Sequence, residues 1–211
     1  MNKTLINRLG LLGVLSLISY TAAVVFSPLA YPGYDSMAQA VSDLSASNAP
    51  SAMLWSRLAA VYHSCHIVCL TLVCIYIQGR LNKALRTGIY LFTVMSWISE
   101  LGYTAFPLSD SGNAGRFQDI MHIYAVTPAV TMLSIASLIA IMTGAFRSGG
   151  KYRSLGIWAA AALAAMFLGV IGIGVLPKQY FGAAERLTPF AAVAFTAVLG
   201  MYMYRGFPEK Q

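Results

Sequence analysis

Charged residues are scarce in this chain of 211 residues: Asp, Glu, Lys and Arg make up 10% of it, whereas 58% is hydrophobic. Roughly a quarter of a soluble globular protein is charged, so the composition excludes a soluble Rossmann or barrel enzyme, which needs polar surface over its core. Cysteine is also rare, with three residues, which excludes a secreted fold built on disulfides. The mean hydropathy of +0.66 excludes a disordered chain.

Long apolar runs are what the chain does have. A bilayer core about 30 Å thick requires ~20 mostly apolar residues per helix, and six runs of about that length lie between charged or Pro- and Gly-containing breaks. They predict an all-α fold, a polytopic six-transmembrane-helix bundle that forms one membrane domain over residues 1–211. The predicted helices span residues 9–26, 52–77, 85–104, 120–146, 155–176 and 187–204. We interpret the first as a retained signal-anchor helix, because its apolar stretch is longer than that of a signal peptide.

The positions of Lys and Arg predict the orientation, because short cytoplasmic loops carry an excess of both. With the N-terminus inside, ten of the fourteen Lys and Arg residues fall in cytoplasmic segments. We therefore expect a multi-pass protein of the cell (inner) membrane with both termini in the cytoplasm. The net charge of +7 is then a topology signal, and we infer no nucleic-acid partner from it.

Two histidines lie at membrane depth on the second predicted helix. Ionisable residues inside a span usually face the bundle interior and mark a site or a structural ion pair. His63 and His66 are three residues apart and share one helical face. With a rise of about 1.5 Å per residue, they lie about 12 Å and about 16 Å below the outer surface.

Glu100, on the third predicted helix, lies roughly 9 Å below the outer surface by the same count. It belongs to a polar stripe that indicates a hydrated cavity or a hydrogen-bonded seam, together with Thr93, Ser96, Tyr103 and Thr104. A lone carboxylate at this depth must be protonated or paired. We expect His63 to be its partner, with Arg57 or Arg186 as alternatives.

Other polar residues are predicted at the outer mouth of the bundle. Asp119 and His122 repeat the spacing of three residues at the start of the fourth helix. The groups that can close over the mouth are Asp35, Asp43, Asp110, Arg116, Glu185 and Arg186. Thr188 and Pro189 are typical of a helix N-cap followed by proline, which would leave Glu185 and Arg186 just outside the sixth helix. The run from Met37 to Leu44 has one apolar face and is compatible with a short helix lying along the membrane interface.

Three histidines and several carboxylates in one half of a small bundle are the inventory of a zinc or other divalent transition-metal site. Its predicted ligands are His63, His66 and His122. No HExxH or CxxC pattern supports it, so hydrogen-bonded structural histidines and proton handling without a metal stay open. We interpret the three cysteines as small packing residues, because they all lie in the second helix.

Several short motifs carry a family resemblance. They are Ser27-Pro28 after the first helix, Tyr34-Asp35 and Val41-Ser42-Asp43-Leu44-Ser45-Ala46 in the first outer loop, Phe106-Pro107 after the third helix, His122 opening the fourth, and Glu185-Arg186 before the sixth. Together they resemble the prokaryotic membrane family called domain of unknown function 998, over nearly the whole chain. This chain has Asp43-Leu44-Ser45 where that family usually has Asp-Leu-Gly. The resemblance implies a six-helix integral membrane protein and supplies no mechanism, because the family has no established activity.

Three functions stay open. The first is an enzyme that hydrolyses or transfers groups on a lipid or other amphipathic substrate at an outward-facing site between helices two, three and four. Its catalytic candidates are Glu100, Asp110 and His63, and its substrate-binding candidates are Asp35, Asp43, Arg116, Asp119, Glu185 and Arg186. The second is a proton-coupled transporter of small molecules. The third is a non-catalytic ligand-binding or accessory membrane subunit.

Overall fold

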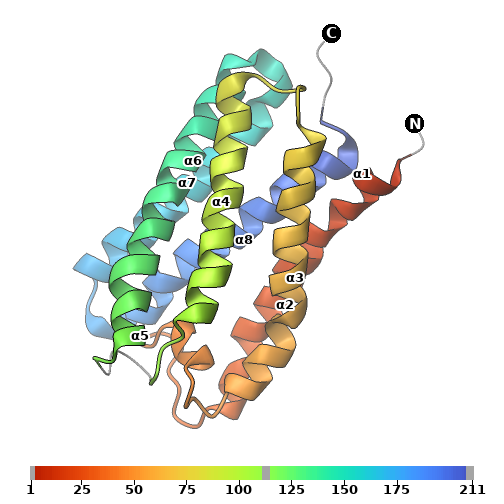
Figure 1. Cartoon of the computed structure of the whole chain (residues 1–211). Coiled ribbons are helices and arrows are strands. Elements are labelled where there is room, and N and C mark those ends of the chain that lie inside the picture. Colours follow the sequence, from red (N-terminus) through yellow and green to blue (C-terminus); the bar gives the residue numbers. More distant parts are fainter. Residues whose placement is uncertain (1–2, 111–114, 208–211) are drawn as a thin grey trace.

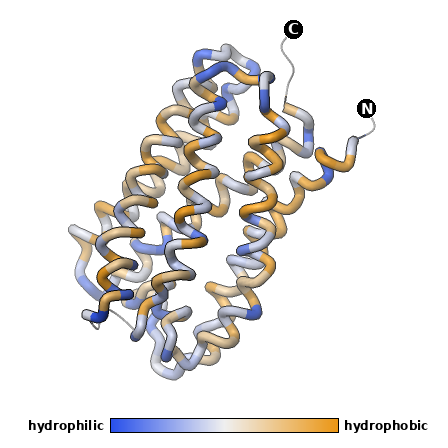
Figure 2. The backbone as a smooth tube through the Cα atoms, viewed as in Figure 1, coloured by the Kyte–Doolittle hydropathy of each residue, from blue (hydrophilic) through white to orange (hydrophobic). Residues whose placement is uncertain are grey.

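The computed structural model describes residues 3–110 and 115–207, and every regular element in these ranges is helical (Figure 1). The long helices are α2 (Leu11–Phe26), α3 (Ala52–Tyr76), α4 (Lys83–Ala105), α6 (Thr127–Arg147), α7 (Arg153–Val175) and α8 (Phe181–Arg205). The short helices are α1 (Leu5–Leu9), η1 (Ser27–Ala30), η2 (Val41–Ser45), α5 (Phe117–Ile120), η3 (Met121–Val126), η4 (Gly149–Tyr152) and η5 (Lys178–Tyr180). Hydrophobic segments fill the middle of the bundle and hydrophilic ones gather toward its ends (Figure 2).

Five helical segments in the described ranges are long and apolar enough to cross a membrane. They are Leu5–Ala30, Ala52–Tyr76, Phe117–Arg147, Gly149–Val175 and Lys178–Arg205. The sequence predicted six crossings, and helix α4 is the one that is not among these five. It is long enough, with 23 residues, but it carries Lys83, Arg86 and Glu100 together with the polar stripe, and these residues reduce its hydropathy.

The bundle is assembled around α8. This helix packs against α2, α3 and α7, while α4 packs chiefly against α6 and α6 also packs against α7. The rings of Phe92 (α4) and Phe195 (α8) meet edge-on, with centroids 5.2 Å apart, in the main core. Gly88 allows α4 and α6 to approach closely, because a Cβ atom on it would lie 2.6 Å from the backbone nitrogen of Ile141.

The N- and C-termini lie at one end of the bundle, and the connection between α2 and α3 covers the other end, here called the loop end (Figure 1). The backbone N–H of Ala183 donates to the carbonyl of Met37 over 3.0 Å, and that of Ser47 donates to Leu108 over 2.8 Å. This connection contains the short helices η1 and η2, and Val41 and Leu44 of η2 are buried against the bundle. The helix expected from Met37 to Leu44 is thus formed only from Val41 on, and its apolar side chains Val41 and Leu44 pack inward, whereas Met37 is exposed.

The start of the last helix also differs from the prediction. Helix α8 begins at Phe181, and Pro189 lies inside it. Thr188 is therefore not an N-cap, and Glu185 and Arg186 are helical residues of α8. Proline prefers the first turn of a helix, but here the helix begins earlier. The residues before Pro189 make hydrogen bonds to the connection between α2 and α3, such as that of the Ala183 N–H to the Met37 carbonyl.

Proline also shapes the fourth long segment. Between α5 and α6 the chain forms a π-helix, η3, whose carbonyl at His122 accepts the N–H of Thr127, five residues on. Pro128 follows at the start of α6 and has no N–H to donate. The wider turn of the π-helix accommodates the proline, which cannot donate a backbone hydrogen bond. It also places His122 at the loop end, facing α4.

Candidate functional site between α3 and α4

The centre of the candidate site is a hydrogen-bonded pair that joins two helices. His63 of α3 and Glu100 of α4 meet through Nδ1 and Oε2, 2.5 Å apart. This confirms the predicted pairing. The His63 side chain is 46% exposed, whereas that of Glu100 is 11% exposed. The carboxylate thus lies behind the imidazole and orients it, and the ring faces outward.

A second layer of the site lies deeper along α3. His66 is buried, and its Nδ1 has no hydrogen-bond partner. The other oxygen of Glu100, Oε1, is likewise buried and unpartnered. The ring of Tyr62 lies 4.8 Å from that of His63 and 5.4 Å from that of His66, centroid to centroid, and its phenol also interacts with Glu100.

The polar stripe of α4 forms a seam with its neighbours. The Thr93 hydroxyl donates to the carbonyl of Ile89 and lies 3.0 Å from Cys74 Sγ of α3. Ser96 donates to the carbonyl of Phe92. The hydroxyls of Thr93 and Ser96 thus have hydrogen-bond partners within the protein. Of the two predicted alternatives, a hydrated cavity and a hydrogen-bonded seam, this supports the seam. The unpartnered Glu100 oxygen is the point at which this seam is incomplete.

His122 belongs to η3 and makes its contacts with the end of α4 and the segment after it. Its Nδ1 is 2.8 Å from the carbonyl of Phe106 and therefore donates to it. The ring packs on Tyr103, with centroids 4.6 Å apart. Because Thr127 Oγ1 donates its one proton to the carbonyl of His122, the phenol of Tyr103 is the donor in its 3.1 Å contact with Thr127. His122 therefore fastens the segment after α4 to η3.

The predicted zinc or other transition-metal site is not assembled. Within residues 3–110 and 115–207, no three His, Cys, Asp or Glu side chains come together as possible ligands. His63 binds Glu100 and His122 binds a backbone carbonyl. His63 and His66 thus lie with Tyr62 and Glu100, whereas His122 is held by the end of α4 and the segment after it.

Arg186 and Glu185 fasten the loop end. The guanidinium of Arg186 donates to the carbonyls of Ser36, Gln39 and Gly182 over 2.6, 2.9 and 2.7 Å, and to the Tyr34 hydroxyl over 2.6 Å. Glu185 Oε2 accepts the backbone N–H of Val41 over 3.1 Å. Both were predicted to bind substrate. The structure places them in hydrogen bonds between α8 and the first connection.

Tyr34 and Asp43 belong to the same fastening. The Tyr34 hydroxyl donates to the carbonyl of Ala40 over 2.7 Å. Burial raises the pKa of Tyr34 to about 12, although the neighbouring Arg186 acts in the opposite direction. Asp43 is buried, and its Oδ2 accepts the backbone N–H of Ala40 over 3.2 Å.

Asp119 is a second structural carboxylate. It is fully buried and accepts the backbone N–H of Ser109 and the Ser109 hydroxyl, each over 2.7 Å, and the N–H of Arg116 over 3.2 Å. It thereby caps α5 and holds the segment that follows α4. Arg116 itself is exposed.

The remaining predicted site residues lie at the surface of the loop end. Asp35 is exposed and accepts the N–H of Met37 over 2.8 Å, within a local turn. Asp110 is exposed at the end of the segment after α4. Neither is close enough to the His63–Glu100 pair for a hydrogen bond in the described structure, so the predicted candidates do not form one site.

The aromatic residues beside the pair were missed by the sequence analysis. The Tyr20 ring lies 5.0 Å from that of Tyr62 and 6.2 Å from that of Trp55, and Tyr20 is buried. The available signal was the position of Tyr62 directly before His63.

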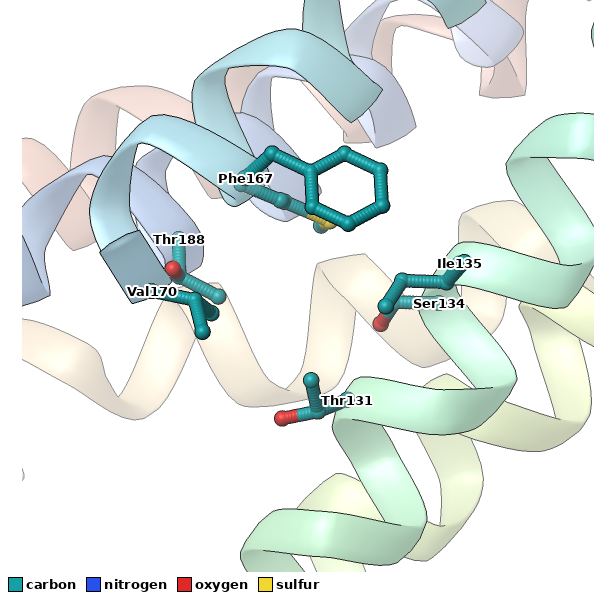
Figure 3. Close-up of a pocket in the computed structure, with 7 residues that line it drawn as sticks. Thr131, Ser134, Ile135, Phe167, Val170 and Thr188 are labelled. Carbon is teal, nitrogen blue, oxygen red and sulfur yellow. The ribbon is translucent and has the colours of Figure 1, made fainter. Parts of the chain in front are cut away.

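A small cavity of about 40 Å³ lies elsewhere, between α6, α7 and α8. Figure 3 shows Thr131 and Ser134 on one side and Phe167, Val170 and Thr188 on the other. The Thr188 hydroxyl is buried without a hydrogen-bond partner. The volume suffices for one or two water molecules.

The comparisons with known proteins give a family but no activity. The family model described as "Protein of unknown function (DUF998)" matches residues 14–202. No curated protein and no solved structure is detectably similar to the chain. The match covers every long helix of the bundle, in part or in full. The chain therefore belongs to the DUF998 family of proteins of unknown function.

Proposed function

We propose that this protein is a membrane-embedded enzyme that hydrolyses, or transfers a group from, a lipid or other amphipathic substrate, with His63 as general base. The observation that carries the proposal is the His63–Glu100 pair, with its 2.5 Å contact and its partly exposed imidazole. A carboxylate that binds one imidazole nitrogen fixes the tautomer and stabilises the imidazolium formed on proton transfer.

The chemistry follows from the two nitrogens of His63. Nδ1 carries the proton shared with Glu100, so Nε2 of the neutral ring has the free lone pair. It can take a proton from a water molecule, whose oxygen then attacks an ester or amide carbonyl. The proton returns from Nε2 to the leaving alcohol or amine when the carbon–heteroatom bond breaks. General base catalysis of this kind typically contributes about 10²–10⁴ in rate.

Access to the site would be sideways from the membrane. The side chains of Val94, Trp97 and Leu101 on α4 are 48%, 42% and 62% exposed, and Val61 on α3 is 43% exposed. Trp97 lies one turn before Glu100 on α4, and these exposed apolar groups would contact the chains of a lipid. An amphipathic substrate could thus keep its tail in the bilayer while its polar group reaches His63.

We also propose that all six long helices cross the inner membrane, with both termini in the cytoplasm and the loop end outside. Charge supports this orientation, since Lys3, Arg8 and Arg205 lie at the end of the bundle with the termini. Helix α4 would cross because its polar stripe is turned into the seam. Single cysteines introduced into a cysteine-free variant should react with an impermeant maleimide in intact cells at position 36 and not at position 150.

The enzymatic proposal is tested by lipid analysis of cells that overproduce the protein. Membranes with the wild type should accumulate a cleaved or transferred lipid product that mass spectrometry detects. Glu100→Gln should reduce its formation about 10²-fold or more, and His63→Gln at least as much. Arg57→Gln is the matched control, because Arg57 is an exposed residue of α3 without a hydrogen bond among the described residues.

The alternatives give different results. A transporter would show no lipid product, but a pH-dependent flux in liposomes that Glu100→Gln abolishes. An accessory subunit would show neither. Unchanged product formation in folded Glu100→Gln protein would remove the pair from catalysis.

A further inference from the structure

The candidate site contains two buried polar atoms that the protein leaves without partners. They are Nδ1 of His66 and Oε1 of Glu100. His66 is 4% exposed and lies one turn below His63 on the same face of α3. The phenol of Tyr62 is within hydrogen-bonding reach of the Glu100 carboxylate, and Glu100 acts electrostatically on His66, so these groups share one neighbourhood. A buried polar group without a partner is unfavourable, and it indicates a ligand group that completes the hydrogen bonds.

The two atoms specify the kind of group. A carboxylate oxygen accepts a hydrogen bond and cannot donate one. The ligand must therefore donate a proton to Oε1. Imidazole Nδ1 can accept or donate, according to its tautomer. A hydroxyl satisfies both atoms, because it donates to Glu100 with its one proton and accepts from His66 with its oxygen.

The charge of the neighbourhood disfavours an anion. The ionisable side chains that act on Tyr62 and His66 in the described structure are Glu100, His63, Tyr20 and Tyr103, with no Lys or Arg among them. Arg186 cannot take this role, since its guanidinium already donates to four acceptors at the loop end. A phosphate or carboxylate here would face the Glu100 carboxylate in a medium of low dielectric constant without compensation.

We propose that the seam between α3 and α4 binds the hydroxyl group of an uncharged amphiphile, held between Glu100 Oε1 and His66 Nδ1 beside Tyr62. The ligand class is a lipid with an alcohol head, such as a long-chain alcohol or a diacylglycerol, and anionic lipids are excluded. This inference rests on the site of the proposed function and names its substrate class. It places the alcohol oxygen next to His63, the group that would deprotonate it or protonate it on departure.

Three photoreactive probes with the same 16-carbon chain provide the test: a primary alcohol, its methyl ether and the corresponding carboxylate. Each carries a diazirine on the chain and is incubated with the wild-type protein in nanodiscs of phosphatidylcholine at pH 8. The alcohol should label peptides of α3 and α4. The ether cannot donate and the carboxylate is repelled, so both should label at least tenfold less, as expected for the loss of a hydrogen bond to a charged group.

Two variants localise the binding. His66→Phe removes one partner and keeps a planar ring in its place, and Glu100→Gln removes the charge. Both should weaken labelling by the alcohol about tenfold or more, whereas Arg57→Gln should not. Because the three probes are compared on the wild type, the test does not depend on folding of the variants.

Every outcome bears on the proposal. Equal labelling by the alcohol and the ether would show contact with the chain alone and overturn the hydroxyl site, and so would stronger labelling by the carboxylate. Labelling confined to other helices would also overturn it. Selective alcohol binding without any lipid turnover would support the site and refute the enzyme, whereas turnover of anionic lipids alone would refute the site and leave the enzyme.

Discussion

Replacing Arg186 should detach the connection between α2 and α3 from the bundle. Its guanidinium donates to four acceptors, and three of them, Ser36, Gln39 and Tyr34, belong to that connection. The fourth, Gly182, lies in the same helix and contributes little to the fastening. Arg186→Met keeps much of the aliphatic stem and removes all of these bonds.

The expected loss can be worked out from the three bonds between segments. A hydrogen bond to a charged group contributes about 1.5–3 kcal/mol, so three independent bonds would give about 4.5–9 kcal/mol. The carbonyls at this end of the bundle can bind water once the guanidinium is gone, and the bonds share one side chain. We therefore expect about 2–4 kcal/mol, which corresponds to a decrease in Tm of about 4–16 °C for a chain of this size.

Thiol exposure on heating provides the assay. Cys69 is fully buried in α3, whereas Cys65 and Cys74 are partly exposed, so the assay uses a background without Cys65 and Cys74, in which a fluorogenic maleimide reacts with Cys69 only when the bundle opens. Arg186→Lys should be intermediate, because an ammonium group cannot reach all the acceptors. Arg57→Met is the control and should melt like the wild type. A Tm of Arg186→Met within 1 °C of the wild type would refute the fastening role and reopen that of a substrate-binding cation.

Other predictions concern capping, packing and pH. Asp119→Asn should destabilise the protein by about 1–3 kcal/mol, the contribution of one or two hydrogen bonds, and should lower the Tm accordingly. The amide has one acceptor oxygen, whereas the carboxylate accepts from Ser109 and from the backbone of Arg116 with two. Gly88→Ala should destabilise the protein by about 1–3 kcal/mol in a chemical unfolding titration, since its Cβ would overlap α6, whereas Gly174→Ala, which has open space, should not. Because the folded pKa of Tyr34 is raised to about 12 from 10.0, its contribution to stability is complete below pH 10 and is lost between pH 10 and 12, so Tyr34→Phe should show a shallower loss of Tm in that window.

The long helices could be predicted because hydrophobic runs of membrane length have few alternatives. Helix α3 begins at the predicted residue, and α4 and α7 begin two residues early. Helices α6 and α8 were the exceptions. Helix α6 begins seven residues after the predicted residue, behind the π-helix η3, and α8 begins six residues before it, because the rule that proline follows an N-cap is local. The hydrogen bonds that extend α8 back to Phe181 come from residues about 150 positions away, and no window around Pro189 contains them.

The site was predictable where depth alone decides it. Counting residues placed His63 and Glu100 at similar depth, and this was sufficient to pair them. Depth does not give the partner of a side chain, so His122 was grouped with the other histidines although its ring binds the carbonyl of Phe106. Depth also could not show that both oxygens of Asp119 accept hydrogen bonds from Ser109. An aspartate that caps a helix and an aspartate that binds a ligand look the same in the sequence, since both can lie near a helix start.

What separates the structural acids from the candidate functional one is how their oxygens are used. Asp119 and Glu185 accept backbone N–H groups, the partners a carboxylate needs in order to stabilise a turn or a helix start. Glu100 binds a titratable side chain with one oxygen and leaves the other buried and unpartnered. Replacing a buried ion pair by apolar residues of similar volume often costs no stability, so packing of the α3–α4 seam does not require Glu100. The hydroxyl ligand that we propose would supply the missing hydrogen bond.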